Sequence, residues 1–301
     1  MKNLSNSVLA ALVGLAAVLT SCSVKEELLI NPVSSKSKVC IDVRTFNLEQ
    51  SAIATKANSA SFPHRLVFKA LDSGGKTAWE SVQASSDPEF GTVNFELAPG
   101  DYTFVAVAHD LSVTSHDDVA ATIVSASQVV FPEPDVHDSF CASKQATVLP
   151  GKTFTAGMSL PRVNSRFRIT MNDAVPAGTK MFTLVVNSGA DTVTDNPSVD
   201  PTSGFALSNR QYSRNFDISA SVGRSGVSIS VNMFVTDVTQ DVDVTASAYD
   251  ADGNMIVSHV LRNVPMKQNR MTVANGNFFK ADGAGSFTYN TEWEQQADIS
   301  Y

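Results

Sequence analysis

Residues 90–108 have the sequence FGTVNFELAPGDYTFVAVA, and this stretch decides the fold. Its first part, residues 90–97, alternates apolar and polar side chains, which is typical of a strand with one buried face. Pro99 and Gly100 then turn the chain into residues 101–108. The aromatic and β-branched residues of that second run predict a central, well-buried strand.

The same alternation continues on both sides of this stretch. Residues 39–43 and 66–70 alternate in the same way, and residues 153–160 continue the pattern. The cluster at residues 72–75, DSGG, predicts a hairpin turn because adjacent glycines supply positive φ angles. Residues 119–127 are rich in small side chains and fit either one short helix or part of a longer excursion.

A second block of strands begins near Pro161. Residues 167–171, 182–186 and 242–248 alternate, whereas residues 187–204 have the composition of a long surface loop. Residues 250–254, DADGN, predict another hairpin turn. Short strands with turn signals every 8–12 residues are typical of β-sandwiches. The mature chain has no long helical periodicity, so we predict an all-β protein with two sandwich domains, at residues 38–160 and 161–301.

The N-terminus resembles a lipoprotein signal peptide. Lys2 provides a short positive region, and residues 8–19 form an apolar run shorter than a comfortable membrane span. Leu19-Thr20-Ser21 then places small residues before Cys22, which predicts cleavage after residue 21 and lipidation of Cys22. The alternative is an ordinary secretory signal followed by a chance cysteine. Residues 22–37 are predicted to be a tether.

The residues after Cys22 favour the cell surface. A lysine followed by two acidic residues, at positions 25–27, resembles the surface-export signal of Bacteroidota lipoproteins. The localisation predicted from it is the outer face of the outer membrane, where lipid such as palmitate on Cys22 anchors the protein.

Charge excludes several classes of partner. The chain has a net charge of −8, and removal of residues 1–21 deletes only Lys2, which makes it −9. An acidic chain without a long basic run repels the phosphates of nucleic acid and of anionic lipid surfaces, so we expect no nucleic-acid partner.

Few side chains are arranged for catalysis or metal binding. His109-Asp110 and residues 116–118, HDD, contain imidazole and carboxylate, but they fit solvated loop residues better than a metal site. Asp250 begins a segment like a calcium loop, yet the later acidic ligand is missing. Residues 223–226, GRSG, lack the spacing of a nucleophile elbow. We therefore predict no enzyme activity, no cofactor and no metal.

Cys40 and Cys141 are the two cysteines left once Cys22 carries lipid. An exported protein meets an oxidising environment, in which such a pair can form a disulfide. The sequence leaves both the bonded and the free state open.

Two segments resemble the fimbrillin superfamily, the pilin-like and anchor-like lipoproteins of Bacteroidota surface fimbriae. The first runs through residues 66–68 and 91–93 to residues 97–109, LAPGDYTFVAVAH, where a Pro-Gly-x-Tyr turn leads into a buried strand. The second combines AYD at 248–250 with VPMKQNRMT at 264–272 and GNFF at 276–279. The resemblance implies two tandem transthyretin-like β-sandwiches and a role in a fimbria.

The resemblance also implies assembly by donor-strand exchange with other fimbrial subunits. In that chemistry a protease removes an N-terminal strand, and a strand from a neighbouring subunit fills the exposed groove. Residues 39–46 have the alternation of that first strand, and residues 47–61 follow as a polar loop. The bond between Lys56 and Ala57 is a better trypsin-like cleavage site than Arg44-Thr45, because it lies outside the strand.

The C-terminal segment leaves two alternatives open. Residues 286–301 alternate around Trp293 and could supply the donated strand, or they could be the last strand of their own domain. A bond between Cys40 and Cys141 would staple the first strand to its domain and so favour a terminal anchor over a shaft subunit.

The function predicted from these features is a structural fimbrial subunit, either stalk or anchor, that supports adhesion or biofilm formation. Its expected partners are sister subunits, the outer membrane through the lipid on Cys22, and a host or bacterial surface receptor of unspecified identity. The alternative is a surface glycan-binding lipoprotein of a nutrient-uptake system, for which Trp79 and Trp293 would be the binding aromatics.

Overall fold

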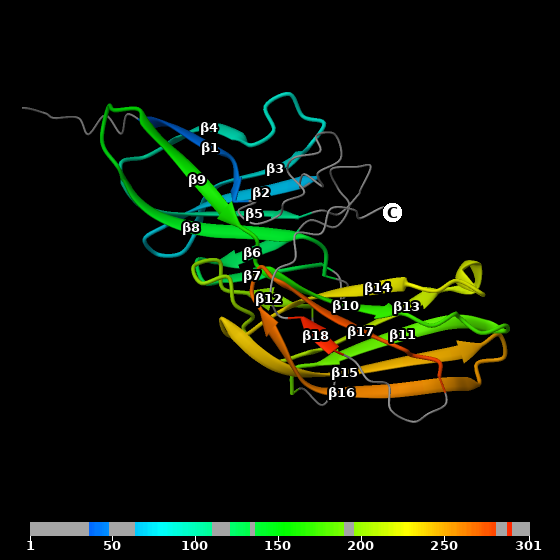
Figure 1. Cartoon of the computed structure of the whole chain (residues 1–301). Helices are drawn as coiled ribbons and strands as arrows, with labels where there is room; N and C mark the ends of the chain where they lie inside the picture. Colours follow the sequence, from blue (N-terminus) through cyan, green and yellow to red (C-terminus); the bar gives the residue numbers. More distant parts are fainter. Residues whose placement is uncertain are drawn as a thin grey trace, which may run out of the picture. The chain divides into compact units, whose positions relative to one another are not determined.

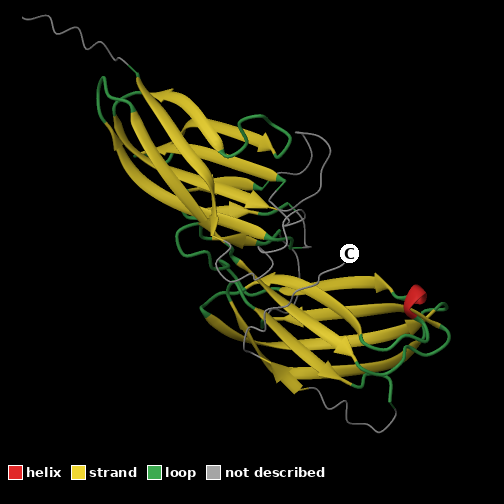
Figure 2. Ribbon diagram, turned by 45° about the horizontal axis from the view of Figure 1, so that its top comes forward, coloured by secondary structure: helices red, strands yellow, loops and turns green. Residues whose placement is uncertain are grey.

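Figure 1 shows the computed structural model of the chain, which describes residues 36–47, 64–109, 121–132, 136–189, 196–280 and 288–290. Within these ranges every element is a strand except one 3-10 turn, η2 (Ser219–Ser221), which is red in Figure 2. The all-β prediction is therefore confirmed. The described part of the chain contains no helix with the length and apolarity that crossing a bilayer requires.

The first sandwich consists of two sheets. One has the order β4-β1-β9, from β1 (Ser37–Asn47), β4 (Thr92–Leu97) and β9 (Phe154–Pro161). The other has the order β3-β2-β5-β8, from β2 (Arg65–Asp72), β3 (Thr77–Ala84), β5 (Gly100–His109) and β8 (Ser139–Val148). The hairpin predicted after residue 70 joins β2 to β3, with Gly75 at a φ of 79°.

The second sandwich also consists of two sheets. One has the order β14-β10-β17-β18, from β10 (Asn164–Met171), β14 (Val227–Phe234), β17 (Met271–Gly276) and β18 (Thr288–Asn290). The other has the order β13-β11-β15-β16, from β11 (Thr179–Asn187), β13 (Gln211–Asp217), β15 (Thr239–Asp250) and β16 (Met255–Lys267). The predicted turn at residues 250–254 joins β15 to β16.

The two sandwiches repeat one topology. Each begins with a strand that is central in its sheet, β1 or β10. Each of these pairs antiparallel with one neighbour, β4 or β14, and parallel with the last main strand of its sandwich, β9 or β17. The first strand of each sandwich is therefore held on both of its edges.

A third, small sheet is built from insertions into the two sandwiches. It has the order β12-β7-β6, from β6 (Thr122–Ser125), β7 (Gln128–Val130) and β12 (Ser198–Val199). Because β6 and β7 form a hairpin, the helical alternative for residues 119–127 is wrong. β12 comes from the segment predicted to be a surface loop, and it pairs with β7 through Val199 and Val129.

This small sheet explains why β5 is buried on both faces. Phe104 and Ala106 belong to the core of the first sandwich, whereas Val105 and Val107 belong to a second cluster that also contains Ile123 of β6. Lys69 of β2 donates to the Ile123 carbonyl oxygen at 3.1 Å, which fixes β6 beside β2. The prediction of a central, well-buried strand is confirmed.

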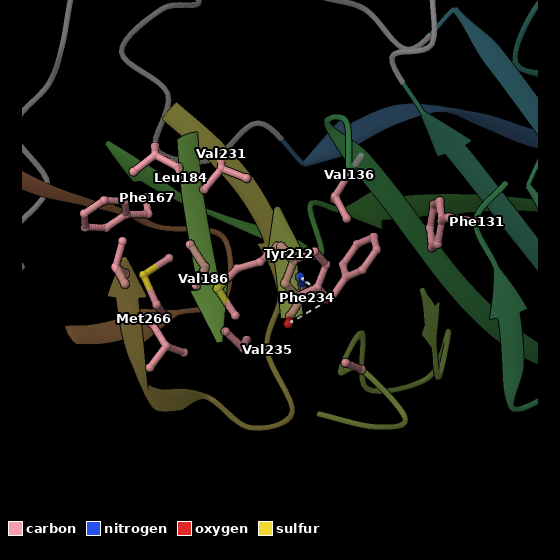
Figure 3. Packing of buried hydrophobic residues seen from close by; sticks show 14 of the residues in the cluster. Phe131, Val136, Phe167, Leu184, Val186, Tyr212, Val231, Phe234, Val235 and Met266 are labelled. Atoms are coloured by element: carbon pink, nitrogen blue, oxygen red, sulfur yellow. Dashed lines mark hydrogen bonds between the residues drawn. The ribbon is translucent and has the colours of Figure 1, made fainter. Parts of the chain in front are cut away.

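The second cluster includes the core of the second sandwich, part of which is shown in Figure 3. The Tyr212 hydroxyl accepts a hydrogen bond from the Phe234 amide at 3.2 Å and donates to the Phe234 carbonyl oxygen at 3.4 Å. Burial raises the pKa of Tyr212 to about 12. Phe234 in turn packs on Phe131, with ring centroids 4.8 Å apart, so this core is continuous with the segment after β7.

Candidate assembly site

The strand predicted to leave during assembly, β1, occupies the middle of its sheet. Residues Ser37–Asp42 pair antiparallel with β4, and the Val43 amide donates to the Gly91 carbonyl oxygen at 2.7 Å. The other edge of β1 pairs parallel with β9, with a register shift between Asp42 and Thr45. Removing β1 would leave the backbone edges of β4 and β9 unpaired and facing each other across about 10 Å, twice the spacing between strands.

The inner face of β1 contributes strongly to the core. Val39, Ile41 and Val43 have exposed fractions of 1%, 0% and 0%. Burial of three aliphatic side chains contributes about 5–9 kcal/mol by area transfer. The groove left by their removal would be lined by aromatic and aliphatic residues of the same cluster, among them Phe68 and Phe95. Such a groove matches an apolar, alternating strand.

The two ends of β1 differ. At its start, the Ser37 hydroxyl donates to the Leu149 carbonyl oxygen at 2.7 Å. At its end, Asn47 is followed by the connection to β2, of which residues 48–63 lie outside the described residues. Lys56 and Ala57 are in that part, and Arg44 is within β1 itself. The choice of Lys56 as the cleavage point stays a prediction.

Part of the C-terminal segment lies in its own sandwich. Residues 288–290 form β18, which pairs antiparallel with β17 through Val273, Ala274 and Asn275. This pairing matches the alternative in which the segment completes its own domain. Residues 291–301, including Trp293, lie outside the described residues, as does Cys22.

The structure holds Cys40 and Cys141 as free thiols. Cys40 lies between Val39 and Ile41, which point into the first core, so its side chain is on the opposite face of β1. Cys141 packs in the other hydrophobic cluster, and burial raises its thiol pKa. The disulfide that the sequence left open is not formed, because the two side chains point away from the shared interior of the sandwich.

His109 is not a solvated loop residue. It ends β5, is 3% exposed, and accepts a hydrogen bond from the Ala121 amide at its Nε2 atom, 3.3 Å away. Burial lowers its pKa to about 4, and the charges of Arg65 and His137 act in the same direction. Its imidazole is therefore neutral at physiological pH. The neighbouring Asp110 and residues 116–118 lie outside the described residues.

The remaining candidates for chemistry have structural roles where they are described. The Asp250 carboxylate accepts from the amides of Asp252 and Asn254 at 2.9 and 2.8 Å, as expected for a turn. No group of three or more His, Cys, Asp or Glu side chains that could hold a metal ion occurs among the described residues. Trp79 is stacked on Phe95, with centroids 4.1 Å apart and planes at 8°, so its half-buried ring packs against the core.

One charged cluster was missed by sequence analysis. The Asp138 carboxylate, 11% exposed, accepts from Arg166 and Arg162 at 3.1 and 3.4 Å and from the Asn164 amide group at 3.2 Å. The cluster ties the segment before β8 to the segment entering β10. Asn164 also accepts from the Ser139 amide at 3.0 Å. The only hint in the sequence was the presence of arginines in an otherwise apolar alternating strand.

Comparison with solved structures gives low identities. A candidate adhesin from Bacteroides ovatus matches with a TM-score of 0.50 and 9% identity, over 82% of this chain and 88% of that chain. This likeness is evidence for the fold. The fimbrial anchor protein Mfa2 from Porphyromonas gingivalis has a TM-score of 0.46 and 12% identity, over 84% and 94% of the two chains. A second B. ovatus candidate adhesin has a TM-score of 0.49 and 12% identity, over 85% and 96%.

Sequence comparison gives one match to a family model. No curated protein sequence matches the chain. A model described as a family of unknown function, DUF6562, matches residues 34–300, which is nearly the whole of the chain. The chain belongs to the DUF6562 family.

Proposed function

We propose that this protein is a non-enzymatic structural subunit of a cell-surface fimbria, stalk or anchor, that assembles by β-strand exchange and supports adhesion or biofilm formation. The observation that carries the proposal is the position of β1. This strand is apolar on its inner face, central in a three-stranded sheet, and followed by a long connection. One cut in that connection would convert the sheet into a groove for another strand.

Further support comes from the fold and from the motifs. A candidate adhesin shares the tandem-sandwich fold, and the motifs at residues 97–109 and 264–272 resemble those of fimbrillins. In the proposed organisation, residues 1–21 are the signal peptide, residues 22–37 the tether, and residues 38–160 and 161–301 the two domains. Lipid on Cys22 holds the protein at the outer membrane, and sister subunits are its partners.

The state of the cysteines bears on the position in the fibre. A bond between Cys40 and Cys141 would have kept β1 in place after cleavage. In the structure both are free thiols, and β1 is held by backbone pairing, by side-chain packing and by the bond from the Ser37 hydroxyl to Leu149. Free thiols give no support to the anchor position that a bond would favour, and both positions are compatible with the proposal.

The test is strand exchange in the mature chain after cleavage. Limited trypsin treatment is expected to cut between β1 and β2 and to leave β1 bound until it is displaced. A peptide of residues 286–301 should then replace it, which intact-mass and size-exclusion measurements would detect. A Lys56→Ala chain and a peptide of scrambled sequence are the matched controls. Cut protein that neither binds the peptide nor forms oligomers with uncut copies would contradict the proposal.

The glycan-binding alternative has a separate test. It used Trp79 and Trp293 as exposed aromatics, but Trp79 is half-buried, with its ring stacked on Phe95. Affinity electrophoresis in polysaccharide gels of the Trp79→Phe, Trp293→Ala double variant should match that of the unchanged chain. A glycan-dependent retardation that the double variant loses would favour the alternative.

A further inference from the structure

The sheet that contains β1 joins two strands that are attached to opposite edges of the facing sheet. In the order β4-β1-β9, β1 lies between β4 and β9 (Figure 1). In the facing sheet, β3-β2-β5-β8, the edge strands are β3 and β8. β4 follows β3 in the chain, and β9 follows β8. Once β1 has left, β4 and β9 are no longer joined by backbone pairing, and each depends on its contacts with the facing sheet.

Gln83 on β3 makes two hydrogen bonds with the start of β4. Its Nε2 atom donates to the Thr92 carbonyl oxygen at 2.8 Å, and its Oε1 atom accepts from the Gly91 amide at 2.8 Å. Both functional atoms of the side-chain amide are thus used on neighbouring residues of one strand. Trp79 lies on the same face of β3, four residues earlier, and stacks on Phe95 further along β4. Together these contacts fasten β4 to the edge of the facing sheet.

The backbone segment that Gln83 holds is also the segment that pairs with β1. The Val43 amide of β1 donates to the Gly91 carbonyl oxygen at 2.7 Å, and Asp42 lies opposite Thr92 in the antiparallel register. Gly91 therefore uses its carbonyl group for the strand that would leave and its amide for Gln83. When β1 leaves, the first bond is lost, whereas the two bonds with Gln83 do not require β1.

The second sandwich contains a contact of the same kind. β13 and β14 correspond to β3 and β4 in the shared topology. Tyr212 of β13 accepts from the Phe234 amide of β14 and donates to the Phe234 carbonyl oxygen. In both sandwiches, a side chain from the edge of one sheet makes two hydrogen bonds with the strand beside the central strand of the other. Only in the first sandwich is that central strand expected to leave.

We propose that Gln83 is a positioning residue for strand exchange, which keeps β4 in place as one wall of the groove after β1 has left. This inference rests on the proposed function, because it concerns the vacated groove. An incoming strand binds only those molecules in which β4 is in position, so its apparent dissociation constant rises as that fraction falls. In the intact chain β1 also holds β4, and the position of β4 there depends less on Gln83.

Three substitutions separate this role from a general contribution to stability. Gln83→Met keeps an unbranched side chain of similar length but removes both hydrogen bonds. Tyr212→Phe is the matched control in the second sandwich, since it removes two hydrogen bonds to the backbone of β14 and leaves the first sandwich unchanged. Gln145→Met, at an exposed glutamine on β8, controls for the substitution itself.

The experiment measures strand affinity in the mature chain with Cys22→Ser, cut by trypsin between β1 and β2. The β1 fragment is exchanged for a fluorescein-labelled peptide of residues 36–47 with Cys40→Ser, and the complex is diluted while fluorescence anisotropy reports the bound fraction. Gln83→Met is expected to raise the dissociation constant of the peptide at least about tenfold, which corresponds to a tenfold fall in the fraction of vacated chains with β4 in position. Tyr212→Phe and Gln145→Met should leave it unchanged.

Hydrogen exchange of the backbone amides in residues 91–97 is the second measurement. While the labelled strand is bound, these amides should exchange at the same rate in Gln83→Met as in the unchanged chain. Once the strand is released, they should exchange faster in the variant. Faster exchange in both states would show a structural role that does not depend on the vacated groove, and would overturn the inference.

The remaining outcomes distinguish this inference from the proposed function. If the unchanged cut chain captures the strand and Gln83→Met captures it with equal affinity, the inference is overturned and the proposed function stands. An equal loss of affinity in Tyr212→Phe also overturns it, because lower stability would then be the cause. If the unchanged cut chain captures no strand, the proposed function fails, and the inference fails with it.

Discussion

The two sandwiches place their first strands alike but hold them differently. β1 and β10 are both central, antiparallel to one neighbour and parallel to the other. β1 offers mainly apolar contacts, and the chain after it runs through residues 48–64 before β2 begins. β10 is followed by the shorter segment of residues 172–178, and Arg166 joins it to Asp138. One cut could therefore free β1, whereas β10 is continuous with its surroundings at both ends.

The second sandwich has further attachments without a counterpart in the described residues of the first. Asp173, just after β10, accepts from the backbone amides of Phe278, Phe279 and Lys280 at 2.8, 2.6 and 2.9 Å. β18 adds a fourth strand beside β17, while the equivalent edge at β9 has none in the described residues. Topology alone therefore does not make a strand exchangeable. The length of the connection after the strand and its polar contacts with neighbouring segments determine whether one cut could release it.

The largest losses of stability are expected from substitutions on the buried faces of β1 and β10. Ile41 and Ile169 are both fully buried, so Ile41→Ala and Ile169→Ala should each lower the free energy of unfolding of the intact chain by about 2–5 kcal/mol. Chemical denaturation would measure this. After cleavage between β1 and β2, only Ile41→Ala should accelerate release of the β1 fragment. Equal release from both variants would break the comparison.

The next largest effect on stability is expected from the charged cluster at the start of β10. Asp138→Ala leaves the partly buried Arg162 and Arg166 without their carboxylate and is expected to lower the free energy of unfolding by about 3 kcal/mol. Asp243→Ala, which loses the exposed pair with Arg262, should change it by less than about 1 kcal/mol. Urea denaturation of both variants makes the measurement. Similar losses of unfolding free energy in the two variants would mean that the cluster contributes no more to stability than an exposed ion pair.

Acidification should weaken the first sandwich through His109. Its folded pKa is about 4, below the ordinary value of 6.5, so the unfolded chain takes up the proton more readily between these pH values. The contribution to stability is complete above about pH 6.5 and falls by about 3 kcal/mol as the pH drops to about 4. His109→Gln should flatten this part of the pH profile of the unfolding free energy. An unchanged slope would show that other groups cause the acid dependence.

The smallest effects are expected for two tyrosine hydroxyls. Tyr212 exchanges two hydrogen bonds with the backbone of Phe234, so Tyr212→Phe leaves a buried amide unpaired and should lower the unfolding free energy by about 1–2 kcal/mol. The Tyr102 hydroxyl donates only to the Ala98 carbonyl oxygen at 2.9 Å, and its loss should change stability by about 0.5–1 kcal/mol. Thermal denaturation of the two variants would show which loses more stability. A larger loss at Tyr102 than at Tyr212 would contradict the greater polar anchoring of the second sandwich.

Strand positions and hairpins were predictable because their signals are local. Alternation along residues 39–43 and 66–70 marks the inner face of each strand, and the clusters at residues 72–75 and 250–254 mark turns. The burial of His109 was not predictable, because it depends on Ala121 and on β6 beyond it. The pairing of β7 with β12 likewise joins segments far apart in the chain, within what local composition marks as loops.

Local sequence patterns were enough to specify the all-β class, the repeated strand pattern and the apolar face of β1. Tertiary structure decided that Cys40 and Cys141 stay apart and that Trp79 stacks on Phe95 against the first core. The reason is physical. The face of a strand on which a side chain lies follows from the alternation of residues next to it in sequence. The strand or side chain that packs over that face comes from a segment far away in sequence.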